Sequence, residues 1–353
     1  MLVSLMFGLD KPVTDVVEKH SSRFYKIMKN SLKVKKEDIL IISDYGADDK
    51  KMSGMLGYGY YHAAKKKGLN ATILFQDPKK GFMFADDHVI EALTRLEKNN
   101  LVIVAVSNKL GRFGEEKSFR NFCAERGHRF LSATGLADVK PHHFDLFLEA
   151  MNVNYSRMKK KGLAIKKLWD KANEIRVKTE AGTDITFDVS GMEAIANIGE
   201  YHETGKGGNM PAGEVYIPPK GLEGVNGKVV IDGSMKTEDG AILVDSPVTM
   251  YVEKGRVVRI DGKDAHLLEQ TFQKFEDRAK YPERVRLVGE LGIGINPGAV
   301  LIGSMIMDEK VLGTAHIAIG SNYWFCGEIK TIYHGDHVFK NPTFYVDGKK
   351  MDV

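Results

Sequence analysis

The sequence has few cysteines, no long apolar run and no recognisable leader, and each shortage excludes a class of protein. Only two cysteines, Cys123 and Cys326, occur among 353 residues. They lie far apart without CxxC spacing, which argues against a disulfide scaffold and favours a reducing compartment. No segment is long enough to cross a membrane, and MLVSLMFGLDKP at the start lacks the features of a signal peptide. These absences predict a cytoplasmic protein.

The charge balance is nearly even, which argues against a nucleic-acid or membrane partner. There are 51 basic and 47 acidic residues, a net charge of +4. The lysine runs at 65–67 and 159–161 fall where helices are expected to end, as solvated helix C-termini commonly do. No basic tract is interleaved with aromatic residues. A composition of 43% hydrophobic and 28% charged residues is typical of a globular protein, and the length predicts two domains.

The first half of the chain alternates between expected strands and helices. Short apolar runs at 38–44, 71–77 and 101–107 predict buried strands, and helical patterns at 51–67, 88–98 and 115–126 follow them. This alternation predicts an α/β domain with a parallel sheet flanked by helices. The run GYGYYH at 57–62 lacks the third glycine of a dinucleotide fingerprint and lies inside an expected helix, which indicates close helix packing.

The second half has a different texture. A helical pattern at 142–171 leads into two strand-like runs, 174–180 and 183–189, joined by a glycine turn typical of a hairpin. Beyond Gly191 the chain is rich in glycine and short strands, and only 264–278 looks helical. We therefore expect an N-terminal α/β domain at 1–190 and a β-rich α+β C-terminal domain at 191–353, divided near Ser190.

The segment IYHGDHVF places polar residues at strand spacing. His334 and Asp336 should share one face, and His337 should point to the other. Such polar residues are often only the wet face of a half-buried strand. An imidazole beside a carboxylate can also belong to a metal site, but the case for one has to come from other parts of the chain.

Three further residues of the C-terminal domain stand in glycine-rich or apolar settings: Glu214, Glu290 and His316. Each has a structural explanation alone, since Glu214 could cap a turn, Glu290 could end a helix or strand, and His316 could donate to a core carbonyl. Together with His334 and Asp336 they supply the imidazoles and carboxylates that a pair of divalent cations needs.

The ordered segments NMPAGEVYIPP, GELGIG, DEKVLGTAHIAIGSNY and IYHGDHVF resemble the M29 family of metalloaminopeptidases, the aminopeptidase T and aminopeptidase S group. The resemblance covers the C-terminal domain. It implies a homodimeric aminopeptidase that uses two divalent ions, Zn, Co or Mn, and acts on peptides or a related small substrate. The implied metal ligands are Glu214, Glu290, His316, Tyr323, His334 and Asp336, with Glu214 and Tyr323 also catalytic. Three weaker candidates for proton transfer, for which we expect surface roles, are Glu309, His202 and Glu203.

Two alternatives stay open. The resemblance extends to the iron-dependent dihydroxypyridine ring-cleaving dioxygenases, and a mononuclear Fe(II) site would need only His334, Asp336 and one further histidine. The short loop after Tyr323 and the histidine at 337 depart from the peptidase pattern. The surplus of carboxylates nevertheless favours a two-metal hydrolase. A non-catalytic protein that retains the fold is the third possibility.

Overall fold

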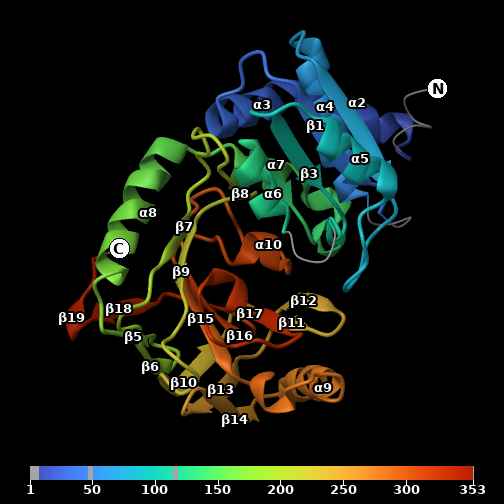
Figure 1. Cartoon of the computed structure of the whole chain (residues 1–353). Coiled ribbons are helices and arrows are strands. Elements are labelled where there is room, and N and C mark those ends of the chain that lie inside the picture. The colour runs from blue at the N-terminus through green and yellow to red at the C-terminus, as the bar shows by residue number, and fades with distance from the viewer. Residues whose placement is uncertain (1–7, 47–50, 114–117, 353) are drawn as a thin grey trace. The chain divides into compact units, whose positions relative to one another are not determined.

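The computed structural model describes residues 8–46, 51–113 and 118–352. The chain forms two compact units (Figure 1). The first consists of Met1–Ser156 and Gly199–Ala212, and the second of Arg157–Ile198 and Gly213–Val353. Within the described ranges, no helix is both long and apolar enough to cross a membrane.

The first unit is built on a five-stranded sheet in which every pairing is parallel. Every residue of the interior strands β1 and β3 is buried, as expected for a parallel sheet covered on both faces. The sheet order is β2 (Ala71–Gln76), β1 (Ile39–Asp44), β3 (Leu101–Ala105), β4 (Arg129–Ala133) and β8 (Gly207–Asn209).

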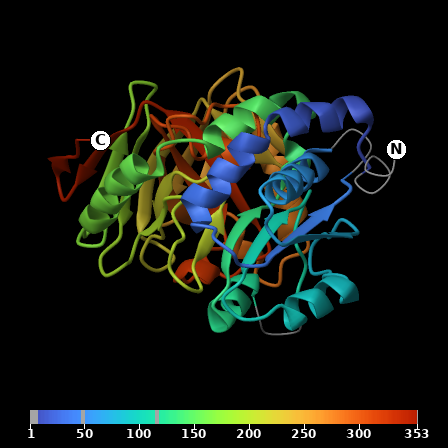
Figure 2. The same cartoon turned by 90° about the horizontal axis from the view of Figure 1, so that it is seen from above.

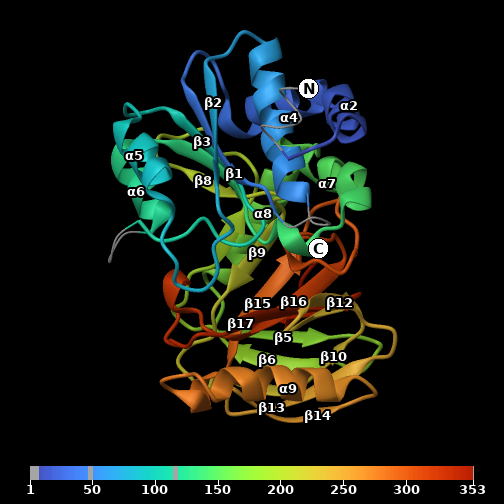
Figure 3. The same ribbon diagram turned by 90° about the vertical axis from the view of Figure 1, so that its right-hand side faces the viewer.

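Helices cover both faces of this sheet, as the sequence predicted. On one face, Leu40 and Ile42 pack against Val89 of α5 (Asp87–Arg95) and Cys123 of α6 (Phe119–Arg126). On the other lies α4 (Met52–Lys66), where a Cβ added to Gly57 would stand 2.7 Å from Oγ of Ser43. The glycines of GYGYYH therefore serve close packing. Figure 3 shows α5 and α6 on the opposite side of the strands from α4, and Figure 2 separates the same layers from above.

The remaining helices of the first unit differ in one respect from the prediction. The expected single helix at 142–171 is two helices; the Asn152 side chain donates to the Leu148 carbonyl at 2.9 Å where the first one ends. Residues 115–117 of another predicted helix lie outside the described part of the chain. The helices are α2 (Lys11–Lys19), α3 (Ser21–Ile27), a π-helical turn η1 (Met28–Leu32), α7 (Phe144–Met151) and the start of α8 (Tyr155–Trp169).

The second unit contains two seven-stranded antiparallel sheets. The first has the order β14 (Arg256–Asp261), β13 (Val248–Glu253), β10 (Val225–Ile231), β6 (Asp184–Asp188), β5 (Glu174–Lys178), β18 (Thr343–Val346) and β19 (Lys349–Lys350). The second has the order β12 (Gly240–Leu243), β11 (Ser234–Thr237), β17 (His334–Lys340), β16 (Thr314–Gly320), β15 (Val288–Gly294), β9 (Glu214–Ile217) and β7 (Ile195–Asn197). The unit also contains most of α8 and the helices α9 (Ala265–Glu276) and α10 (Met305–Asp308).

The fold class is confirmed, but the units do not separate near Ser190. The predicted hairpin β5–β6 pairs with β18 and β10, strands of the second unit. Trp169 at the end of α8 also packs on Phe344 of β18, with ring centroids 5.7 Å apart. These contacts hold residues 157–198 in the second unit, whereas β8 returns the segment 199–212 to the parallel sheet of the first.

Candidate metal centre

One face of the second sheet gathers five of the predicted metal ligands. They come from four adjacent strands, β17, β16, β15 and β9. In this register Ala318 stands opposite both Glu290 and Asp336, and Glu214 stands opposite Gly294. Directly opposed residues share a face of a sheet. The residues that share this face are Glu214, Glu290, His316, His334 and Asp336.

Glycine provides the room for the buried imidazole. His316 stands opposite Gly292, and a Cβ added to that glycine would lie 2.0 Å from Nε2 of His316. Any other residue at 292 would therefore occupy the volume of the ring. Gly292 of the segment GELGIG is thus needed to leave space for the His316 ring.

We expect Gly292→Ala to displace the His316 ring and to destabilise the protein by about 1–3 kcal/mol, the usual cost of overpacking a core. Urea denaturation measures the stability, and equilibrium dialysis against a divalent ion measures metal affinity. Unchanged values of both would contradict the close approach.

Glu290 lies at the centre of the group. Its two carboxylate oxygens are 3.3 Å from Nε2 of His316 and 4.0 Å from Nε2 of His334. Nε2 of His334 is also 3.6 Å from Oδ1 of Asp336. Glu290, His334 and Asp336 each offer one ligand atom, and these three atoms all lie within 4.8 Å of one another.

A hydrogen bond of the His334 ring leaves its other nitrogen free to bind a metal. Its Nδ1 lies 2.8 Å from the Ser321 carbonyl oxygen, which can only accept, so Nδ1 carries the proton. Nε2 then presents its lone pair toward Glu290 and Asp336, the arrangement found in metal-binding histidines. Asp336 is only 8% exposed, so this segment is not the wet face of an ordinary strand.

The site holds more negative charge than its own residues neutralise. Burial, followed by repulsion from Glu214 and Glu309, raises the pKa of Glu290 to about 8. Burial and the charge of Glu290 raise the pKa of Asp336 to about 6, and burial raises that of Glu309 to about 8. When several carboxylates are buried close together, their mutual repulsion opposes ionisation. A bound cation stabilises the ionised forms.

The residues present fit a divalent cation. Oδ1 of Asp336 is buried and has no hydrogen-bond partner among the described residues, although it faces His334. Carboxylate oxygens and a neutral imidazole suit Fe, Mn, Co or Zn. The further histidine that an iron site was expected to need is not in the compact group of three; the neighbouring His316 lies against Glu290.

Lys310 is the residue that sequence reasoning missed. It is fully buried, with Nζ 2.6 Å from Oε1 of Glu214, and it also forms an ion pair with Glu309. Although burial lowers the pKa of Lys310, the charges of Glu214 and Glu309 outweigh that effect and raise it. The surface role expected for Glu309 is wrong, since its side chain is only 17% exposed and lies among the other carboxylates. The sequence Asp308, Glu309 and Lys310 is a run of charged residues without apolar periodicity, so nothing in it indicates burial.

Tyr323 is placed differently from the other predicted ligands. It begins the short 3-10 helix η5 (Tyr323–Phe325) and is 61% exposed. The Lys330 ammonium nitrogen lies over its ring, 5.0 Å from the ring centroid. Its role as ligand or catalytic group stays a prediction.

The next residue, Trp324, is 62% exposed and contacts the His334 ring edge to face, with the ring centroids 4.8 Å apart. An exposed aromatic side chain therefore lies directly beside the candidate metal group.

His337 lies on the opposite face of β17, as expected. It is fully buried, and burial lowers its pKa to about 3. Neither ring nitrogen has a hydrogen-bond partner within the described part of the chain. This histidine is therefore a neutral core residue.

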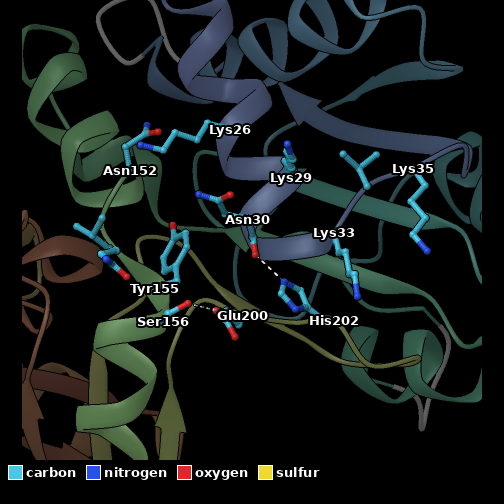
Figure 4. A pocket seen from close by; sticks show the side chains of 13 residues that line it. Lys26, Lys29, Asn30, Lys33, Lys35, Asn152, Tyr155, Ser156, Glu200 and His202 are labelled. Carbon is cyan, nitrogen blue, oxygen red and sulfur yellow. Dashed lines mark hydrogen bonds between the residues drawn. The ribbon is translucent and has the colours of Figure 1, made fainter.

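A basic pocket in the first unit contains none of the predicted metal ligands (Figure 4). Its volume is about 840 Å³, and its lining includes Lys26, Lys29, Lys33 and Lys35. His202 closes one side, with Nε2 2.6 Å from the Asn30 carbonyl oxygen. His202 and Glu203 are exposed, in agreement with the surface roles expected for them. A ring of lysines does not bind a divalent cation, so this pocket is not an alternative metal centre.

The candidate metal group and the family to which the chain belongs together support a metal-binding enzyme. A family model described as 2,5-dihydroxypyridine 5,6-dioxygenase matches residues 142–352, and the chain belongs to this family. This range contains all six of the ligands predicted from the sequence. The family model thus names the dihydroxypyridine dioxygenases, the related family to which the resemblance was expected to extend, rather than the aminopeptidases.

Individual relatives agree with this assignment. The 2,5-dihydroxypyridine 5,6-dioxygenase of Pseudomonas putida is 25% identical over 203 residues, which are 55% of this chain and 56% of that protein. The matched region thus spans little more than half the length of this curated relative. Two solved structures share the fold. They are 2,5-dihydroxypyridine dioxygenase from Pseudomonas putida KT2440 (TM-score 0.70, 18% identity, 95% and 94% of the two chains) and AmpT from Thermus thermophilus (0.61, 15%, 94% and 97%).

Proposed function

We propose that this protein is an Fe(II)-dependent dioxygenase that cleaves the ring of a hydroxylated pyridine. The observation that carries the proposal is the group formed by Glu290, His334 and Asp336, whose ligand atoms lie within 4.8 Å of one another. This group falls inside the residues matched by the dioxygenase family. One imidazole and two carboxylates would hold an iron ion and would leave room beside it for substrate and dioxygen.

The residues of the chain have distinct parts in this proposal. Nε2 of His334 and one oxygen each of Glu290 and Asp336 would hold the ion. His316 is a positioning residue, since its Nε2 lies 3.3 Å from Glu290 and fixes that carboxylate. Fe(II), when bound, supplies the reactivity toward dioxygen that amino-acid side chains lack.

Trp324 is suited to bind an aromatic substrate. Its ring is exposed and lies beside His334, so a planar heterocycle near the metal group could stack on it. We expect Trp324→Ala to raise KM for a dihydroxypyridine about tenfold, which corresponds to about 1.4 kcal/mol, while Trp324→Phe stays near the parent value. Steady-state oxygen uptake measures both. Tyr281→Ala, which removes another exposed aromatic ring, is the control; equal effects of Trp324→Ala and Tyr281→Ala would exclude a stacking role.

The two-metal aminopeptidase remains the second candidate. Glu214, Glu309 and His316 adjoin the group of three, and a second ion would find ligands among them. The resemblance of the whole chain to AmpT supports an aminopeptidase T-like fold but not the activity.

One experiment separates the two functions. Protein reconstituted anaerobically with Fe(II) is mixed with 2,5-dihydroxypyridine in aerated buffer, and oxygen consumption and loss of substrate absorbance are followed. In parallel, protein loaded with Zn, Co or Mn is assayed with aminoacyl amides. We expect stoichiometric oxygen uptake and no amide hydrolysis. Hydrolysis without oxygen uptake would replace the proposal by the aminopeptidase.

The cytoplasmic location, the homodimer and the absence of nucleic-acid and membrane partners stay predictions. Gel filtration coupled to light scattering would measure the oligomeric state directly.

A further inference from the structure

We infer that the ammonium group of Lys310 takes the place of a second metal ion and so restricts the centre to a single ion. This inference deepens the proposed function and rests on it. The observations that carry it are the position of Lys310, the way its backbone is fixed, and the residues with which it pairs.

Lys310 lies on the Glu214 side of the group. Its Nζ is 2.6 Å from Oε1 of Glu214 and also contacts the Glu309 carboxylate. Glu214 in turn approaches His316, with 3.9 Å between Oε2 and Nε2. These carboxylates and the imidazole are the ligands left for a second cation once Glu290, His334 and Asp336 hold the first. The ammonium already stands between two of them.

The backbone around Lys310 is held so that the side chain stays in the site. The Asn296 N–H donates to the Lys310 carbonyl at 2.8 Å. A Cβ added to Gly294 would lie 2.8 Å from the carbonyl carbon of Lys310, so only glycine lets this segment lie so close to β15. The Asp308 carboxylate accepts backbone N–H groups of Ile302, Gly303 and Ser304 at 2.8–3.0 Å.

An ammonium and a metal ion exclude one another at this position. A protonated lysine has three donors and no lone pair, so it satisfies carboxylates but cannot bind a metal. A divalent ion bound to Glu214 would also face the lysine charge across a few ångströms of buried protein, where screening by solvent is weak. Lys310 therefore neutralises Glu214 and Glu309, and only the group of three remains available to a metal.

The test is metal stoichiometry, which does not depend on activity. The full-length wild-type protein, Lys310→Met and Lys310→Arg are dialysed to equilibrium against Mn(II) or Zn(II), and bound metal is measured by mass spectrometry. We expect about one ion per chain for wild type and Lys310→Arg and about two for Lys310→Met, as in dinuclear sites. Lys79→Met is the matched control, because Lys79 is also buried (5% exposed) and paired with one carboxylate, Asp86. It should keep one ion.

A second variant keeps the inference testable if Lys310→Met does not fold. Glu214→Gln retains an acceptor for Lys310 but removes the charge. If Glu214 is only the counter-ion of Lys310, this variant binds one ion with wild-type affinity. A loss of affinity of tenfold or more would make Glu214 a ligand and overturn the inference.

The outcomes also separate this inference from the proposed function. Two ions in wild type, or one ion of unchanged affinity in folded Lys310→Met, overturn the role of Lys310 and leave oxygen uptake to be judged separately. A wild-type protein with one ion and no activity toward hydroxylated pyridines overturns the function but not the role of Lys310.

Discussion

Replacing His334 by alanine should leave the protein without stoichiometric iron and almost without ring-cleaving activity. His334 is the one imidazole in the compact group, and its bond to the Ser321 carbonyl fixes Nε2 for the metal. Loss of a partner outside the ligand set typically costs about 10–100-fold in affinity or activity, so loss of a ligand should cost more than about 100-fold. Iron content after anaerobic reconstitution and oxygen uptake are the measurements.

The same strand provides the control, His337→Leu. His337 faces the opposite side of β17, is fully buried and has no hydrogen-bond partner within the described residues. Leucine should therefore keep the iron and stabilise the protein by about 1 kcal/mol, because it removes buried polar atoms that nothing satisfies. If both variants lost iron equally, the effect of His334→Ala would reflect damage to the strand rather than loss of a ligand.

The metal-free protein should lose stability as the pH rises from 6.5 to 9. Burial raises the pKa values of Glu290 and Glu309 to about 8 in the folded state, well above the 4.5 of an unfolded chain. In this range the folded state binds more protons than the unfolded state, so the free energy of unfolding falls as the pH increases. We expect a loss on the order of a few kcal/mol. Urea denaturation at several pH values measures it.

Addition of a divalent ion should reverse this dependence. Metal binding requires the ionised carboxylates, so the stabilisation by metal grows with pH. The measurements start at pH 6.5 because His337 has the opposite effect below that pH. There its protonation in the unfolded state makes the free energy of unfolding rise as the pH increases. In Glu290→Gln the decline should be markedly smaller. A metal-free stability that is constant or rises over this range would contradict the crowded carboxylate site.

The fold was largely predictable because its signals are local. Buried parallel strands such as β1 are uninterrupted apolar runs, and the glycines of α4 mark its approach to the sheet. The break between α7 and α8 was not predictable from periodicity, since the apolar pattern runs on across residues 152–154, and Asn152 caps the first helix with its side chain. The division into units was not predictable either, because it depends on which distant strands pair with β5 and β6.

The candidate site divides in the same way. His334 and Asp336 share a face because strand geometry alternates side chains, and this alternation can be read from the sequence. That Glu290 lies between His334 and His316 follows only from the register of β15, β16 and β17. The burial of Glu309 could not be predicted from the sequence, because exposure depends on how its segment packs against the rest of the chain.

By itself, the sequence determined an α/β unit, a β-rich unit and a set of side chains whose chemistry suits a metal ion. These follow from residue type and short-range periodicity, which fix secondary structure and chemistry. Only the tertiary structure decided which carboxylates meet, and that Lys310 neutralises two of them. The charge balance of a buried site depends on distances between residues that are remote in the chain, and such distances are set by strand pairing and packing.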